Sequence, residues 1–168
     1  MFARYIGHYR NHIADRSRPY PGVEAALDRL ADSGIRLAVC TNKYESLSLR
    51  LLDALGLTQR FAAICGQDTF PMKKPDPETL RLTIARAGGD PARAVMVGDS
   101  NTDVQLARAA VVPVIGVDFG YTQTPMSELA PDRLIGHFDV LPAAVMELLP
   151  RIGAMQDENA AIPVVKAD

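Results

Sequence analysis

The chain has 168 residues, of which 48% are hydrophobic, which is enough for one domain with a sizeable core and too few for two. Its formal net charge of −2, with both signs spread along the chain, excludes a basic stripe for nucleic acid and a cationic helix for a membrane surface. Two cysteines without zinc-ligand spacing, both beside apolar runs, are expected to be reduced thiols in the core. The absence of a signal-peptide pattern and of a long apolar run favours a cytoplasmic location.

Short apolar runs alternate with amphipathic segments along most of the chain. Strands that alternate with helices imply an α/β fold, a Rossmann-like parallel sheet with helices on both faces. We predict helices at about 1–14, 20–33, 47–55, 77–87, 101–110, 127–129 and 142–149, and strands at 35–40, 61–65, 92–97, 111–117 and 133–135, the last at an edge.

The stretch 95–103 combines the end of a predicted strand with two carboxylates. Three apolar residues are followed by a glycine, which allows a tight turn, and then by a first helical turn capped by Ser100 or Asn101. In a parallel sheet, ligands bind at the carboxyl ends of the strands. Asp99 and Asp103 can therefore converge on one hard cation, for which we predict Mg²⁺, with helix capping by these residues as the alternative.

The predicted strand over 35–40 leads into Thr41, Asn42 and Lys43. A threonine hydroxyl, an asparagine amide and the backbone N–H groups of a turn together make a good cradle for an anion. The alternative interpretation is an ordinary helix cap by Thr41 or Asn42.

Residues 66–77 are predicted to form a loop, because they include a glycine and three prolines. Prolines on both sides of Asp76 stiffen the segment and would hold a neighbouring lysine in a defined place. Lys74 is the candidate cation and Lys73 its competitor. Because all the candidate groups follow strands or adjoin them, they are expected at one end of the sheet, where anion-binding dipoles, a positive charge and two carboxylates suit a phosphoryl group with Mg²⁺.

Three motifs, in this order and spacing, resemble the second, third and fourth motifs of the haloacid dehalogenase superfamily. They are Val39-Cys40-Thr41-Asn42-Lys43, Lys74-Pro75-Asp76-Pro77 and Gly98-Asp99-Ser100-Asn101-Thr102-Asp103. Tyr20-Pro21-Gly22-Val23, Thr41-Asn42-Lys43 and Gly66-Gln67-Asp68-Thr69 look closest to the phosphoglycolate phosphatase branch.

The resemblance implies roles for five residues of this sequence. Thr41 and Asn42 would hold the phosphoryl oxygens, and Lys74 would neutralise the charge of the phosphate and of the nucleophile. Asp99 would bind Mg²⁺, with Asp103 supporting it. Thr41 and Lys74 are thus the expected catalytic residues.

The family's first motif, Asp-x-Asp-Gly-Thr, which supplies the aspartate nucleophile and the acid/base, does not occur in this sequence. By resemblance, residues 1–18 would be the remnant of a helical cap with its linker, and 19–150 the α/β core. The family's first central strand would be missing between the strands that end at Cys40 and Gly98. We expect either an open gap or direct pairing of those two strands, and hence poor stability or self-association through the uncovered sheet. Residues 151–168, where the pattern is lost, are expected to be a mobile tail.

The resulting hypothesis is a fragment of a Mg²⁺-dependent phosphatase that acts on a small phosphate monoester, with 2-phosphoglycolate as the first choice. By resemblance the reaction would pass through a phospho-aspartyl intermediate, whose nucleophile this chain lacks, so the chain alone is expected to be inactive. The alternatives are a sugar-phosphate phosphatase or phosphomutase of the same branch, and a phosphate- or metal-binding module without catalysis. A receiver-type signalling domain ranks last, because its acidic residues precede its threonine and lysine. A small phosphorylated metabolite is the expected partner.

Overall fold

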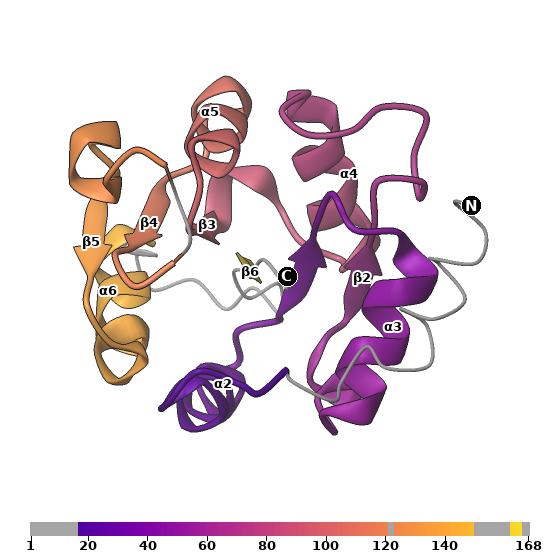
Figure 1. Cartoon of the computed structure of the whole chain (residues 1–168), viewed down its shortest axis with the longest axis horizontal. Coiled ribbons are helices and arrows are strands. Elements are labelled where there is room, and N and C mark those ends of the chain that lie inside the picture. Colours follow the sequence, from indigo (N-terminus) through magenta and orange to yellow (C-terminus); the bar gives the residue numbers. More distant parts are fainter. Residues whose placement is uncertain (1–16, 121–122, 150–161, 166–168) are drawn as a thin grey trace, which may run out of the picture.

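The computed structural model describes residues 17–120, 123–149 and 162–165. They form a six-stranded sheet in the order β2-β1-β6-β3-β4-β5, in which every neighbouring pair is parallel. Helices cover both faces of this sheet (Figure 1). The predicted Rossmann-like α/β class is therefore confirmed, whereas the predicted helix over 1–14 lies outside the described residues.

The elements follow the predicted order, with shorter strands. The strands are β1 Ala38–Cys40, β2 Ala63–Cys65, β3 Ala94–Gly98, β4 Val114–Val117, β5 Arg133–Ile135 and β6 Ile162–Val165. The helices are α2 Val23–Asp32, α3 Glu45–Ala54, α4 Pro77–Arg86, α5 Asn101–Ala110 and α6 Leu141–Leu148, with the short 3-10 helices η1 Thr58–Arg60, η2 Pro91–Arg93, η3 Met126–Leu129 and η4 Phe138–Val140. No described helix has the length and apolar character needed to cross a membrane.

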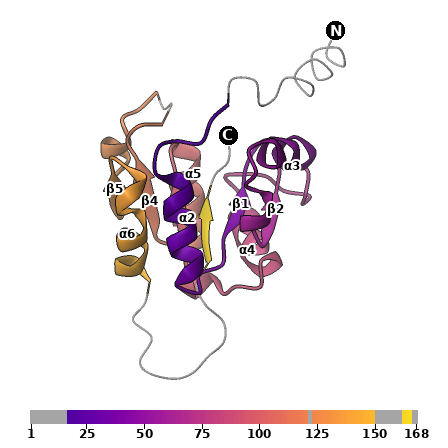
Figure 2. The same ribbon diagram turned by 90° about the horizontal axis from the view of Figure 1, so that it is seen from below.

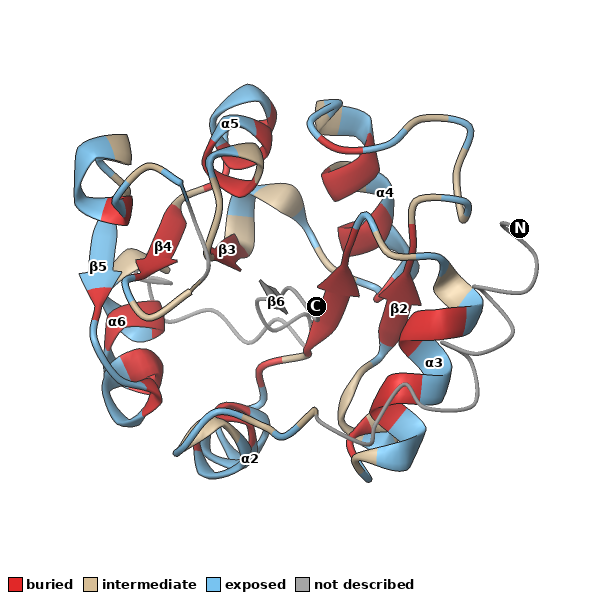
Figure 3. Ribbon diagram, in the orientation of Figure 1, coloured by how far each residue is buried: buried red, intermediate tan, exposed pale blue. Residues whose placement is uncertain are grey.

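The core lies on both faces of the sheet, which explains why β1 and β3 are continuous apolar runs rather than alternating ones. Ala38, Cys40 and Met96 pack in a cluster with the inner faces of α4 and α5. Their neighbours Val95 and Val97 turn to the other face, against α2 and α6. Figure 3 shows buried residues along β1, β2 and β4, and exposed residues on the outer faces of the helices.

The central position between β1 and β3 is occupied by β6, the strand that comes last in the chain (Figure 2). β6 runs parallel to both neighbours, and Val164 is in register with Ala38 of β1 and Met96 of β3. The expectation of a mobile tail over 151–168 is thus wrong for residues 162–165. The expectation that the gap stays open, or that β1 and β3 pair directly, is wrong as well.

The physical reason is that two buried strand edges present backbone N–H and C=O groups that need partners. A short run rich in β-branched residues, Ile162 to Val165, supplies them from the far end of the chain. Self-association through an uncovered sheet stays an untested prediction, and in this structure the edges of β1 and β3 are already paired.

Candidate active site

The centre of the candidate site is a buried ion pair between Lys74 and Asp103. Lys74 Nζ lies 2.8 Å from Asp103 Oδ1, and both side chains are only 1% exposed. The pair connects the loop after β2 to the first turn of α5. A charge buried to this extent needs a partner of opposite sign, so each residue holds the other in place. Lys74, and not the exposed Lys73, is therefore the lysine that the structure brings to the predicted site.

Ser100 is a second partner of the Asp103 carboxylate. Its hydroxyl donates to Asp103 Oδ2 at 2.6 Å. Ser100 is also the N-cap of α5, since its side chain accepts a hydrogen bond from the Asp103 backbone N–H. The capping prediction is confirmed for Ser100. The alternative that Asp99 and Asp103 act as the cap is wrong. The hydrogen bond from Ser100 to the Asp103 side chain was not predicted from the sequence.

Gly98 allows this arrangement because a side chain would not fit there. A Cβ at Gly98 would lie 2.3 Å from the Cβ of Asp103, closer than side-chain atoms pack. The chain thus turns sharply from β3 into α5 with the Asp103 carboxylate directly against the turn. The predicted tight turn at this glycine is confirmed, and its cause is the close approach of Asp103.

The loop that carries Lys74 is anchored at the start of α4. Asp76 is the N-cap of this helix and accepts a hydrogen bond from the Glu78 backbone N–H at 2.9 Å. Pro77 fills the first helical position, where no amide donor is needed. The Asp76 backbone N–H also donates to the Lys73 carbonyl at 3.0 Å. The stiff segment predicted around Lys74 is therefore held by a turn on one side and a helix cap on the other.

Asp99 lies at the carboxyl end of β3 and is partly exposed, unlike Asp103. Gly120, in the loop after β4, packs against it so closely that a Cβ there would come within 2.3 Å of the Asp99 Cβ. Next to Gly120 in sequence, Phe119 contacts the rings of Tyr20 and Phe138, each with centroids 5.2 Å away. The loop after β4 thus borders the acidic side of the site, and the sequence showed it only as a loop.

On the other side, the turn after β1 holds Thr41 and Asn42. Thr41 is 1% exposed, and its hydroxyl oxygen accepts a hydrogen bond from the Lys43 backbone N–H at 3.1 Å. Asn42 is exposed. The alternative that these residues cap the next helix is wrong, because α3 begins only at Glu45 and its N-cap is Tyr44.

The loop after β2 fixes this turn from outside. The carboxylate of Asp68 accepts a hydrogen bond from the Glu45 backbone N–H at 2.8 Å, which caps α3 from a different loop. The Gln67 backbone N–H donates to the Lys43 carbonyl at 3.0 Å. Gly66 permits the contact, since a Cβ there would lie 2.1 Å from the Glu45 nitrogen. Backbone contacts, and not side-chain packing alone, therefore hold the shape of the predicted anion cradle.

The positive charge of Lys74 influences the thiol of Cys40, at the end of β1. Burial raises the pKa of the Cys40 thiol, and the positive charge of Lys74 opposes this shift. Burial also raises the pKa of Cys65, which is in register with Cys40 on β2. Both cysteines are free and buried, as predicted. The charge of Lys74 thus reaches the strand that leads into Thr41 as well as the helix that carries Asp103.

The predicted site residues are therefore gathered at the carboxyl edge of the sheet. Thr41 and Asn42 follow β1, Asp99 follows β3, and β6 separates the two strands. Parallel strands lie roughly 4.8 Å apart, so the ends of β1 and β3 lie about 10 Å from each other, with β6 between them.

The described residues offer part of a metal site. Among them, no group of three or more His, Cys, Asp or Glu side chains is placed to hold a metal ion. The carboxylate oxygens of Asp103 bind Lys74 and Ser100, which leaves this residue a supporting position. Asp99 is the partly exposed oxygen donor of the pair, and hard oxygen donors suit Mg²⁺. Asp99 can therefore supply one protein ligand to such an ion, and the other ligands would come from elsewhere.

Comparison with known proteins assigns this chain to a family. The model of the haloacid dehalogenase-like hydrolases matches residues 1–117. The chain belongs to this family. The resemblance noted in the sequence is therefore confirmed at the level of the family.

Within the family, this chain is similar to proteins named phosphoglycolate phosphatase. It is 54% identical to the one from Mesorhizobium japonicum over 147 residues, which cover 88% of this chain and 65% of that protein. It is 52% identical to the one from Agrobacterium fabrum, with 92% of this chain and 66% of the relative covered. The chain thus spans just under two thirds of the length of these relatives.

Solved structures agree. A predicted phosphoglycolate phosphatase from Haemophilus somnus 129pt superposes with a TM-score of 0.80 at 29% identity, over 84% of this chain and 64% of that one. CbbY from Rhodobacter sphaeroides, solved in complex with phosphate, superposes with a TM-score of 0.73 at 29% identity, over 83% of this chain and 64% of that one. Both share the fold described above.

Proposed function

We propose that this chain carries the phosphate cradle, the lysine and the acidic side of a Mg²⁺-dependent phosphatase site for a small phosphate monoester, with 2-phosphoglycolate as the first substrate. The observation that carries the proposal is the buried Lys74–Asp103 pair, 2.8 Å across, which joins the loop after β2 to the first turn of α5. Its support from relatives is their name, phosphoglycolate phosphatase, at up to 54% identity. We also propose that the enzyme is cytoplasmic.

The lysine has two tasks in this proposal. Its ammonium group, fixed by Asp103, presents a positive charge toward the end of β1, where it would neutralise phosphoryl oxygens. It would also lower the repulsion between a carboxylate nucleophile and the phosphate. Because Lys74 is 1% exposed, water does not screen this charge as it would at the surface.

The turn after β1 would bind the phosphoryl oxygens. The Thr41 hydroxyl oxygen accepts a hydrogen bond from the Lys43 backbone N–H. The hydroxyl hydrogen therefore remains available to donate to an oxygen of the substrate. Asn42 adds an amide donor from the exposed side of the turn. Asp99 would hold Mg²⁺, which would screen the phosphate charge and orient the group, and Asp103 would support that position through the first turn of α5.

The bond-making residue is the missing part. In the proposed reaction a carboxylate oxygen attacks phosphorus, the ester oxygen leaves with a proton from a second carboxylic acid, and water later releases phosphate from the aspartyl group. The sequence contains no Asp-x-Asp-Gly-Thr motif to supply these two carboxylates. We therefore propose that the 168-residue chain binds phosphate and Mg²⁺ but does not turn over an ester.

Calorimetric titration of the pure chain with Mg²⁺ and inorganic phosphate tests the binding part. The proposal expects saturable heat for phosphate that depends on Mg²⁺ and on Asn42, with Asn42→Ala reducing the affinity at least tenfold. Flat traces for the folded chain would contradict it. Gln59→Ala, an exposed change on η1 far from the carboxyl edge, is the matched control and should bind as the parent does.

A phosphate- or metal-binding role without catalysis is the second candidate. The observation in its favour is that the cradle and the ion pair are fully formed by this chain's own residues, although the nucleophile motif does not occur in the sequence. A sugar-phosphate phosphatase or phosphomutase remains the alternative within the enzyme class. Competition between phosphate and 2-phosphoglycolate or glucose 1-phosphate in the same calorimeter separates these substrates.

A further inference from the structure

The loop after β4 lies directly against the side chain of Asp99, the proposed Mg²⁺ ligand. A Cβ at Gly120 would come within 2.3 Å of the Asp99 Cβ, 2.9 Å of its Oδ2 and 3.0 Å of its Cγ. The backbone of Gly120 therefore follows the Asp99 side chain from its first carbon to one carboxylate oxygen. The φ angle of Gly120 lies outside the left-handed region, so space, and not backbone conformation, requires a glycine here.

The loop itself is anchored to β5 and η4. The Asp118 backbone N–H donates to the Ile135 carbonyl at 3.1 Å. The ring centroid of Phe119 lies 5.2 Å from that of Tyr20 and 5.2 Å from that of Phe138, a spacing at which aromatic rings attract each other. We call these three rings the aromatic clamp. A backbone hydrogen bond and two ring contacts thus fix the loop next to Gly120.

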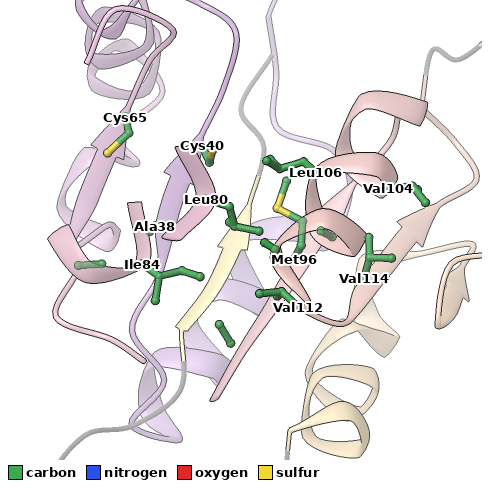
Figure 4. Close-up of a cluster of buried hydrophobic side chains, with 14 of the residues drawn as sticks. Ala38, Cys40, Cys65, Leu80, Ile84, Met96, Val104, Leu106, Val112 and Val114 are labelled. Carbon is green, nitrogen blue, oxygen red and sulfur yellow. The ribbon is translucent and has the colours of Figure 1, made fainter. Parts of the chain in front are cut away.

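The backbone on either side of Asp99 is held by other means. Met96 of β3, Leu106 of α5 and Val114 of β4 belong to one buried cluster (Figure 4). Ser100, the next residue in the chain, caps α5. The Asp99 side chain is partly exposed, so the core does not by itself select one of its staggered conformations. The orientation of this carboxylate is the property that the loop after β4 can set.

We propose that Gly120 and the aromatic clamp are positioning elements of the metal site. The clamp fixes the loop, and the loop holds the Asp99 carboxylate in the orientation in which it meets Mg²⁺. This inference rests on the proposed function, in which Asp99 is the Mg²⁺ ligand. A ligand that is oriented before the ion arrives loses less conformational entropy on binding, and Mg²⁺ demands near-ideal geometry from its ligands. Changes behind a metal ligand typically cost about 10- to 100-fold in affinity.

Gly120→Ala tests the contact with Asp99 directly. The added methyl group must displace the Asp99 side chain or the loop. We expect the Kd for Mg²⁺, measured by calorimetry on the full chain with inorganic phosphate present, to rise about tenfold. Gly136→Ala is the matched control, because a Cβ there would lie at an ordinary 3.5 Å from the carboxylate of another aspartate, Asp118. It should bind Mg²⁺ as the parent does.

Phe119→Leu tests the aromatic clamp without touching Asp99. It keeps an apolar side chain at this position but removes the ring from both aromatic pairs. The Kd for Mg²⁺ should rise about threefold. Phe61→Leu makes the same change at another partly buried phenylalanine, at the C-cap of η1, and should leave the Kd unchanged. If Gly120→Ala does not fold, this pair of variants decides.

A second readout shows whether these effects pass through Asp99. In chains that carry ¹³C at the aspartate Cγ, the Asp99 signal is assigned by its loss in Asp99→Asn. It should move in the ion-free Gly120→Ala and Phe119→Leu variants and stay in place in the two controls. A parent-like Kd in both loop variants would overturn this inference alone, as would a weaker Kd with an unmoved Asp99 signal. No Mg²⁺ binding by the parent would overturn the proposed function, and the metal role of the loop with it.

Discussion

The two sides of the candidate site are built in different ways. On the β3 side, Lys74, Asp103 and Ser100 are joined through their side chains, and the lysine and the aspartate lie inside the protein. On the β1 side, backbone contacts hold the turn, and the side chain of Asn42 is exposed. The acidic side is therefore part of the protein's buried core, whereas the cradle lies at the surface. Changes on the first side should appear in stability, and changes on the second in binding.

The largest expected effect follows from removing the buried cation. Lys74→Met leaves Asp103 as an uncompensated buried charge, and we expect the free energy of unfolding to fall by about 3–5 kcal/mol. Urea denaturation followed by circular dichroism measures it. Lys73→Met, an exposed change one residue away, should stay within about 0.5 kcal/mol of the parent. A loss below about 1 kcal/mol for Lys74→Met would show that the pair does not anchor the fold.

The double variant sharpens the same point. Lys74→Met combined with Asp103→Leu removes both charges, and it should recover a large part of the stability lost by Lys74→Met alone. If the loss of stability in the double variant equalled the sum of the losses in Lys74→Met and Asp103→Leu, the two residues would act separately. That result would contradict an interaction across the 2.8 Å contact.

A smaller loss is expected at Ser100. Ser100→Ala removes the cap of α5 and one hydrogen bond to the Asp103 carboxylate, which should cost about 1–2 kcal/mol in the free energy of unfolding. Ser33→Ala, at the exposed C-cap of α2, is the matched control and should cost less than about 0.5 kcal/mol. Equal losses at the two serines would contradict a special role for Ser100.

On the cradle side we expect almost no effect on stability. Asn42→Ala changes an exposed side chain, so the free energy of unfolding, measured by urea denaturation, should stay within about 0.5 kcal/mol of the parent while phosphate binding weakens. A parent-like affinity, or a loss of stability comparable to that of Ser100→Ala, would remove the distinction between the two sides.

The smallest effect concerns the two thiols. Burial raises the pKa of Cys40 and of Cys65, so the folded chain keeps these protons to higher pH than the unfolded chain does. Their contribution to stability is full below about pH 8.5, the ordinary pKa of a thiol, and is lost as pH rises through the folded pKa values. Urea midpoints at pH 7 to 10 measure this loss. The double variant Cys40→Ala with Cys65→Ala should show a smaller fall above pH 8.5, and an equal fall would contradict the assignment.

The sequence predicted most of these features because they depend on local patterns. Apolar runs predicted the strands, helical spacing predicted the helices, and Lys74 was singled out because it adjoins the prolines on both sides of Asp76. The position of Asp103 followed from its spacing to Asp99. Its burial and its partner Ser100 did not, because they depend on the close approach at Gly98, which appears only in three dimensions.

The largest miss was β6. A four-residue run with a proline in it is a weak strand signal, and it lies after a stretch without periodicity. What places it in the sheet is the demand of two buried strand edges, β1 and β3, for backbone partners. That demand arises from strands far away in the sequence, so no local pattern around residue 163 contains it.

The most direct test of the account is the turnover of 2-phosphoglycolate and p-nitrophenyl phosphate by the pure, folded 168-residue chain with Mg²⁺. We expect no release of phosphate above that of the Asp99→Asn variant, although phosphate still binds to the parent. Steady turnover by the parent, abolished in Asp99→Asn, would contradict it, because the chain would then supply its own nucleophile.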